Sequence, residues 1–385
     1  MKFDFSKPID RRKEGSAKWN CPDGVLPMWV ADMDFEVAPC IQKTMQERIS
    51  HPCYGYTALP KEWASSYLRF FEKQFNAALK SDSLCFSIGV IPSLSCAIRA
   101  FSDPGDEVVL LSPVYNIFDH SAENSFRRVL RSPLLCSNGV YSIDWSGLES
   151  CLSHEKTKIM VLCNPHNPVG RIWSKQELIR IASLASRHGV LLISDEVHGP
   201  INGGEIPYTP YFSVSEEARL NSISLFAPTK AFNIAGVMTS ACYCENPEIR
   251  AKLAFSLNAD ELAEGNFLSY LVAISAWEEG GEWLKEMNEY VHRNYLYCLS
   301  ILKERLPQAV VSPMEATYLL WLDLSKLIDD DVAFCEGLKK KTGLWIIPGS
   351  TYGPEGKGHV RINLATQRCR VEDGMRRLLS YFEEA

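Results

Sequence analysis

Four side chains with different chemistry follow four short apolar runs in the middle of the sequence. They are an aromatic ring, an amide, a carboxylate and an amine: Tyr115, Asn167, Asp195 and Lys230. Taken alone, each type has an ordinary structural role, such as packing for the ring, a turn for the amide and a cap for the carboxylate. Their occurrence together, each just after an apolar run, indicates one shared site.

Of these four residues, Lys230 is the hardest to explain by a structural role alone. It lies in the stretch Pro228-Thr229-Lys230-Ala231-Phe232-Asn233, which holds no other charged residue. A partly desolvated lysine has a depressed pKa and reacts readily with carbonyl groups. Pyridoxal phosphate needs an amine for its aldehyde, a carboxylate for its pyridine nitrogen, an amide for its phenolic oxygen and a ring that stacks on it. The four side chains together therefore predict pyridoxal phosphate as the cofactor.

The four apolar runs are expected to be parallel strands of one sheet. Residues 107–111, 158–163, 190–193 and 222–226 are strand-length and apolar, as in strands covered on both faces. A helical pattern at 174–188 separates two of them. Strands that alternate with helices predict an open α/β sheet, and ligands bind beyond the carboxyl ends of its strands. The four side chains are therefore expected at one edge.

The chain is long enough for a large domain with a smaller companion. Its 385 residues are 46% hydrophobic and 23% charged, which is an ordinary globular composition. After residue 284 the pattern changes to a long helix followed by strands and helices, which predicts a small α+β domain. We expect an N-terminal segment packing with the small domain, a large cofactor-binding domain and the small domain: residues 1–45, 46–284 and 285–385.

Composition and motifs argue against several other classes. The 40 Lys and Arg against 47 Asp and Glu give a net charge of −7 with no basic block, which disfavours nucleic acid. No apolar run reaches the roughly 18 residues of a membrane span, and no signal peptide opens the chain. The 13 scattered cysteines predict free thiols in the cytoplasm rather than disulfides or a metal site. No dinucleotide-binding glycine motif follows a strand.

The motif Asn164-Pro165-His166-Asn167-Pro168-Val169-Gly170 resembles that of the class I/II aminotransferase superfamily, a group of fold-type I pyridoxal-phosphate enzymes. Asp195 lies 28 residues after Asn167, Lys230 lies 35 residues after Asp195, and Arg361 lies 131 residues after Lys230. The resemblance covers essentially the whole chain. It implies a large domain with a mostly parallel sheet between helices, plus a smaller α+β domain.

The resemblance also implies roles for individual residues. Lys230 would bond to the cofactor's aldehyde, Asp195 would hold its pyridine nitrogen, Asn167 would bind its phenolic oxygen and Tyr115 would stack on its ring. Arg361 would clamp the α-carboxylate of the substrate near Asn167, a bidentate role that lysine fills poorly.

Phosphate-binding groups are predicted at the start of a helix that follows Gly89. The N–H groups of Val90 and Ile91 would point at an anion from the helix N-terminus. The hydroxyl of Thr229 is a further candidate donor. The alternative is an ordinary strand-to-helix turn.

Within the superfamily the chain resembles the C–S lyases that are similar to cystathionine β-lyase. The stretches WVADMDF (29–35), YGYT (54–57), SDEVH (194–198) and YLLWLD (318–323) carry this resemblance. His198 stands where many aminotransferases have a cofactor-contacting tyrosine, and Met238 stands where many have an arginine on the phosphate. The resemblance implies that Tyr56, rather than Tyr54, reaches the active site of a partner subunit, and hence a homodimer.

The expected reaction is α,β-elimination of cystathionine or related S-substituted cysteines to a thiol, pyruvate and ammonia. Elimination and transamination share their first step, in which Lys230 takes the α-proton as a general base. The same residues would serve both reactions. An aminotransferase acting on an L-amino acid is therefore the alternative, followed by a non-catalytic regulatory protein that kept the fold.

Overall fold

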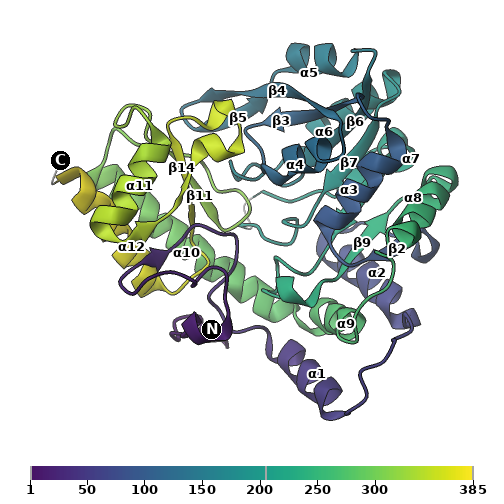
Figure 1. Ribbon diagram of the computed structural model, residues 1–385, viewed down its shortest axis with the longest axis horizontal. Helices are drawn as coiled ribbons and strands as arrows, with labels where there is room; N and C mark the ends of the chain where they lie inside the picture. Colours follow the sequence, from purple (N-terminus) through teal and green to yellow (C-terminus); the bar gives the residue numbers. More distant parts are fainter. Residues whose placement is uncertain (1, 204–205, 384–385) are drawn as a thin grey trace.

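The computed structural model describes residues 2–203 and 206–383, and an eight-stranded sheet forms its centre (Figure 1). The strand order is β2-β9-β8-β7-β6-β3-β4-β5. Neighbouring pairs from β8 to β4 are parallel, whereas β9, β2 and β5 pair antiparallel at the two edges. In chain order the strands are β2 (Leu84–Ser87), β3 (Glu107–Ser112), β4 (Arg128–Ser137), β5 (Val140–Ile143), β6 (Thr157–Cys163), β7 (Leu191–Asp195), β8 (Ser222–Phe226) and β9 (Ser240–Tyr243).

The four predicted strands are β3, β6, β7 and β8, which lie next to one another in the sheet. The prediction of a mostly parallel α/β sheet is confirmed. Because these strands run in the same direction, their carboxyl ends meet at one edge.

Helices cover both faces of this sheet, and a separate apolar core lies on each face of β3. Alternate residues of β3 point to opposite faces, so that Val108 and Leu110 join one core while Val109 and Leu111 join the other. Helices α3 and α8 contribute to the first core, and α5 and α6 contribute to the second. The helices of this part are α2 (Lys61–Phe75), α3 (Val90–Phe101), α4 (Ile117–Glu123), α5 (Trp145–Leu152), α6 (Lys175–Arg187), α7 (Glu216–Leu220), α8 (Pro247–Ala259) and α9 (Ser269–Glu279).

Helix α6 begins where the sequence predicts. Its capping residue Ser174 accepts from the N–H of Glu177, and the Glu177 carboxylate accepts from the N–H of Ser174 at 2.7 Å. This reciprocal pair satisfies two N–H groups that the helix itself leaves free. The chain then turns at Gly189, whose φ of +66° suits glycine.

A second, antiparallel sheet lies beside the first and has the order β10-β11-β14-β13 (Figure 1). Its strands are β10 (Val310–Val311), β11 (Leu319–Asp323), β13 (Ile347–Pro348) and β14 (His359–Asn363), with helices α10 (Gly281–Arg305), α11 (Asp331–Thr342) and α12 (Arg368–Glu383) around it. The N-terminal strand β1 (Leu26–Pro27) pairs with β12 (Leu344–Trp345). The boundaries expected at residues 45 and 284 stay a prediction.

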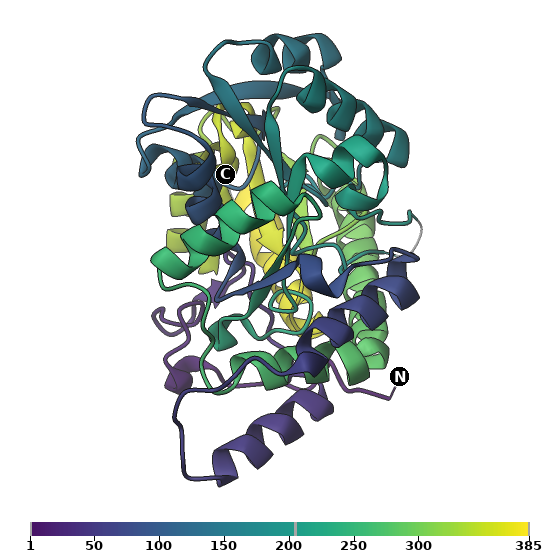
Figure 2. The same ribbon diagram turned by 90° about the vertical axis from the view of Figure 1, so that its right-hand side faces the viewer.

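Helix α1 (Pro39–Ser50) and the connection that follows it stand at the edge of the molecule. Residues 53–60 form neither helix nor strand, and Figures 1 and 2 show the connection running outside the body of the chain before α2 begins. Within residues 2–203 and 206–383, no helix is both long and apolar enough to cross a membrane.

Candidate active site

A cavity of about 240 Å³ lies at the edge where β6, β7 and β8 end. Eight residues predicted to hold the cofactor line it together: Val90, Ile91, Tyr115, Asn167, Asp195, His198, Thr229 and Lys230. They come from stretches of the chain that span about 140 positions, and the parallel strands bring them to one place. Their roles stay predictions.

Lys230 follows β8 and points its amine at the N-terminal segment. Its Nζ donates a hydrogen bond of 2.7 Å to the carbonyl oxygen of Ala31. Burial lowers the pKa of Lys230, and this effect outweighs the nearby carboxylates of Asp32 and Asp195, which raise it. A lowered pKa leaves more of the amine unprotonated at neutral pH, so Lys230 is suited to act as a nucleophile or as a base.

Asp195 is the last residue of β7 and is buried. Its Oδ1 accepts a hydrogen bond of 3.0 Å from the N–H of Val197. Burial raises the pKa of Asp195 to about 6, although the hydrogen bond from Val197 and the charge of Lys230 lower it. A protonated ring nitrogen beside this carboxylate would supply a positive partner and favour its charged form.

Arg361 lies on β14 and reaches across to the large sheet. Its Nη1 donates to Oδ1 of Asn167 at 3.0 Å, and its Nη2 donates to the carbonyl of Trp29 at 3.2 Å. The side chain is buried, and among the described residues its Nε has no partner and its guanidinium has no carboxylate within ion-pair distance. A buried cation without a counter-charge suits a carboxylate ligand, because the ligand would offset the cost of burial.

The N-terminus of α3 faces the same cavity. The first hydrogen bond inside the helix runs from the N–H of Ser93 to the carbonyl of Gly89, so the N–H groups of Val90 and Ile91 precede it and have no partner inside the helix. Such free N–H groups, with the positive end of the helix dipole, favour an anion such as a phosphate. Met238 also lines this cavity and is about half exposed.

Two ring side chains complete the lining. Tyr115 is half-buried and packs edge-on against Phe118 at 5.7 Å between ring centres. His198 is buried, and its Nδ1 has no partner among the described residues. Burial, with the nearby charges of Lys230 and Arg361, lowers the pKa of His198 to about 3. The imidazole is therefore neutral and can offer one ring nitrogen to a ligand.

Tyr56 does not line this cavity. Its side chain is fully exposed in the connection between α1 and α2. Tyr54 differs, because its hydroxyl donates to the carbonyl of Ile49 at 2.8 Å and its ring packs on Phe267.

Sequence reasoning missed the backbone of the N-terminal segment as a part of this site. The Ala31 carbonyl accepts from Lys230 and, at 3.2 Å, from the hydroxyl of Tyr318. Nδ2 of Asn363 holds the same segment by donating to the carbonyls of Val30 and Asp32 at 2.6 and 2.7 Å. Every residue has a backbone carbonyl, so the sequence does not show which carbonyl takes part in a site. Only the distinctive stretch 29–35 could have drawn attention to the N-terminal segment.

The chain belongs to the class I and II aminotransferase family, whose sequence pattern matches residues 24–378. It is 35% identical over 382 residues to cystathionine beta-lyase PatB of Bacillus subtilis, covering 98% of this chain and 99% of that relative. It is 33% identical over 386 residues to protein MalY of Escherichia coli, covering 98% of each. The solved structure of cystalysin from Treponema denticola, which contains pyridoxal 5'-phosphate, is 29% identical and covers all of both chains with a TM-score of 0.96.

Proposed function

We propose that this chain is a pyridoxal-phosphate-dependent C–S β-lyase that converts cystathionine or related S-substituted cysteines to a thiol, pyruvate and ammonia. The observation that carries the proposal is the single cavity in which the amine of Lys230, the carboxylate of Asp195 and the N-terminus of α3 lie together, with Arg361 bonded to its lining residue Asn167. The relationship to cystathionine beta-lyase PatB over nearly the full length supports the lyase reaction.

The donor set of the cavity fits pyridoxal phosphate. Its residues offer an amine to the aldehyde, a buried carboxylate to the pyridine nitrogen, an amide near the phenolic oxygen and free N–H groups to the phosphate: Lys230, Asp195, Asn167, Val90 and Ile91. When bound, the cofactor supplies an electron-accepting ring that stabilises negative charge at the substrate's α-carbon. The unpaired Nδ1 of His198 gives one more polar group that a ligand can satisfy.

The residues of the chain then have separate tasks in elimination. Arg361 binds the substrate's carboxylate with its guanidinium, whose Nε has no partner among the described residues, and fixes the orientation of the α-carbon. The amine of Lys230 takes the α-proton as a general base. Asp195 keeps a proton on the ring nitrogen. The carbon–sulfur bond breaks, its electron pair leaves with sulfur as a thiolate, and the remaining product hydrolyses to pyruvate and ammonia.

The test is an assay of purified protein with cystathionine, in which pyruvate, ammonia and thiol are measured with and without an added 2-oxo acid. A lyase releases all three products without the oxo acid. If no pyruvate forms and the amino group is transferred only when the oxo acid is present, the result would instead favour the aminotransferase. No turnover of either kind would favour a regulatory protein.

Met238 gives the first prediction. If it faces the phosphate, Met238→Arg adds a charge-assisted contact worth about 1.5–3 kcal/mol, which corresponds to roughly tenfold to a hundredfold tighter cofactor binding. The measurement is retention of the cofactor's visible absorbance during dialysis. Met238→Gln is the matched control, since it has similar length without charge. Equal retention in wild type and Met238→Arg would show that residue 238 does not face the phosphate.

We further propose a homodimer in which Tyr56 enters the active site of the partner subunit. The exposed phenol of Tyr56 stands on a connection outside the body of the chain, whereas Tyr54 is anchored on its own chain. An exposed aromatic side chain of this kind is typical of an interface residue.

Subunit mixing tests this arrangement. Tyr56→Phe should weaken cofactor binding or slow turnover, and Lys230→Ala should be inactive. After free subunit exchange, half of the dimers are mixed and each has one complete site, so about a quarter of the wild-type activity should return. No recovery, once exchange has been demonstrated, would place Tyr56 outside the partner's site.

We also propose the cytoplasm as the location of the enzyme. All 13 cysteines lie in the described residues and are free thiols. Free thiols persist in a reducing compartment.

A further inference from the structure

The loop that joins β13 to β14 is held together at its two ends. The buried carboxylate of Asp331, at the start of α11, accepts a hydrogen bond of 2.8 Å from the N–H of Ser350 and one of 3.3 Å from the N–H of Gly358. Gly349 and Gly356 lie so close together that a side chain on either would collide with the carbonyl oxygen of the other. Contacts at both ends therefore fix the path of the loop.

This loop places the ring of Tyr352 against Arg361. Cζ of Arg361 lies over the Tyr352 ring, 4.7 Å from its centre, and the ring packs edge-on against Trp321 at 5.7 Å between ring centres. Tyr352 is buried, and its carbonyl accepts a hydrogen bond of 2.9 Å from the N–H of Val114. Val114 directly precedes Tyr115, which lines the cofactor cavity. Tyr352 therefore connects the arginine to the turn that carries Tyr115.

The ring of Tyr352, rather than its hydroxyl, is the group that acts on the arginine. Burial raises the pKa of Tyr352 to about 12, although the charge of Arg361 lowers it, so the phenol is neutral at physiological pH. Among the described residues its hydroxyl has no hydrogen-bond partner. A neutral aromatic ring attracts a cation through its negatively polarised face.

An aromatic ring suits a cation that must stay available to a ligand. A carboxylate beside Arg361 would occupy the N–H groups that a substrate carboxylate needs, and the substrate would have to displace it. The ring contacts the face of the planar guanidinium, whereas the N–H groups point outward at its edge. Nη1 and Nη2 donate to Asn167 and Trp29, and Nε has no partner among the described residues. The ring therefore stabilises the charge without competing for these donors.

We propose that Tyr352 is a positioning residue for substrate binding, because its ring holds the guanidinium of Arg361 in the orientation that binds the substrate's carboxylate. The inference rests on the proposed function, in which Arg361 has that role. An aliphatic side chain at position 352 could fill the space but could not attract the guanidinium. A carboxylate ligand would then have to restore the orientation of Arg361 and would bind more weakly.

Calorimetry with 4-(methylthio)butanoate on the holoenzyme tests this role. The compound has a carboxylate but no amine, so it can neither bond to the cofactor's aldehyde nor be consumed, whichever reaction the enzyme catalyses. Wild type should bind it at least about tenfold more tightly than the neutral 4-(methylthio)butanamide, because a charge-assisted contact is lost in the amide.

The variants at position 352 separate the ring from the hydroxyl. Tyr352→Leu should weaken binding of 4-(methylthio)butanoate about three- to thirtyfold, which is the range that a cation–π contact supplies. Tyr352→Phe keeps the ring and should stay within about twofold of wild type. Tyr352→Met is a second variant without a ring, and it guards against a folding defect of the first because methionine adapts to irregular spaces.

Tyr141→Leu is the matched control for a purely structural role. Tyr141 is buried in the same apolar core as Tyr352, and its hydroxyl accepts from Nε1 of Trp321 at 2.9 Å, but it makes no described contact with Arg361. This variant should bind 4-(methylthio)butanoate within about twofold of wild type. Cofactor affinity should be unchanged in Tyr352→Leu, because Tyr352 is not among the described residues that line the cofactor cavity.

Several results would overturn the role of Tyr352. They are no saturable binding or no preference for the carboxylate in wild type, unchanged affinity in both Tyr352→Leu and Tyr352→Met, and an equal loss in Tyr352→Phe or in Tyr141→Leu. A parallel loss of cofactor affinity in Tyr352→Leu would also overturn it, since the variant would then disturb the whole site. Failure of the proposed lyase function would appear separately, as absence of pyruvate, and would leave the calorimetric comparison valid.

Discussion

Lys230→Ala is expected to abolish elimination, lowering the turnover number by at least about 10⁴-fold. The variant loses both the amine that would bond to the cofactor's aldehyde and the base that would take the α-proton. It should also lose the visible absorbance that the bound cofactor owes to its bond with this lysine. Pyruvate release and the absorption spectrum measure the two effects independently.

The fold of Lys230→Ala should survive. The side chain makes one hydrogen bond, to the Ala31 carbonyl, and burial of its amine already lowers its pKa. The lost bond and the relieved desolvation oppose each other, so we expect the melting temperature of the apoprotein to move by less than about 4 °C. Lys230→Arg is the matched control, because it keeps a cation but has no comparable nucleophile. Wild-type activity in either variant would show that another residue acts as the amine.

Much of the large sheet could be predicted because its central strands are covered on both faces. Such strands are continuous apolar runs, and β3, β6, β7 and β8 were recognised on that basis. The strands on either side of these four escaped notice. β2 and β9 are four residues long, and β4 carries arginines and serines because several of its side chains reach solvent. Short or half-exposed strands leave no apolar run to detect.

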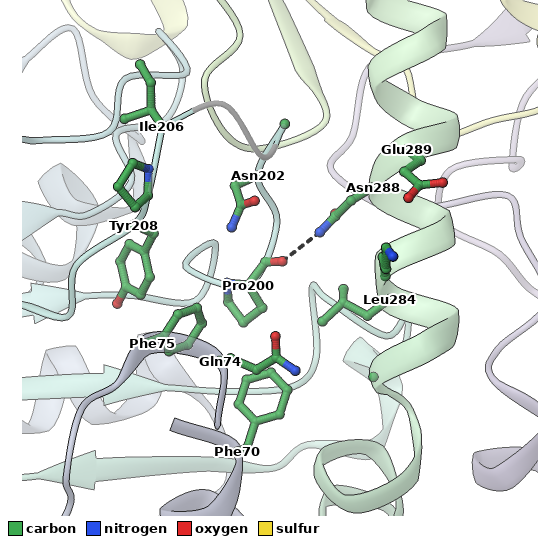
Figure 3. Close-up of a pocket in the computed structure, with 14 residues that line it drawn as sticks. Phe70, Gln74, Phe75, Pro200, Asn202, Ile206, Tyr208, Leu284, Asn288 and Glu289 are labelled. Atoms are coloured by element: carbon green, nitrogen blue, oxygen red, sulfur yellow. Dashed lines mark hydrogen bonds between the residues drawn. The ribbon is translucent and has the colours of Figure 1, made fainter. Parts of the chain in front are cut away.

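The cofactor cavity could be predicted for a similar reason. Asp195 ends a recognisable strand, and Asn167 and Lys230 each follow one, so the topology alone brings them to one edge. A second cavity, of about 450 Å³, could not be found in this way. The described residues that line it include the end of α2 and the first turns of α10, and these residues follow no apolar strand (Figure 3).

Asp195→Asn is expected to leave cofactor bound but to reduce the turnover number by about 10²–10³-fold. Asparagine has the same shape and can still accept the hydrogen bond from the N–H of Val197, but it carries no negative charge to keep a proton on the ring nitrogen. Pyruvate release at saturating cystathionine, compared with the cofactor content of the same sample, measures the loss. Near-normal turnover would show that another residue keeps the proton on the ring nitrogen of the cofactor.

The same variant should change how stability depends on pH. Burial raises the pKa of Asp195 from 3.8 to about 6, so the folded apoprotein binds this proton more tightly than the unfolded chain does. Stability from this group is therefore present below about pH 4 and lost as the pH rises to about 6, a loss of about 3 kcal/mol. Asp195→Asn has no such proton, so its apoprotein should gain stability relative to wild type as pH rises through this window. Urea unfolding of both apoproteins at the two ends of the window measures that difference, and parallel pH profiles would show that folding does not raise the pKa of Asp195.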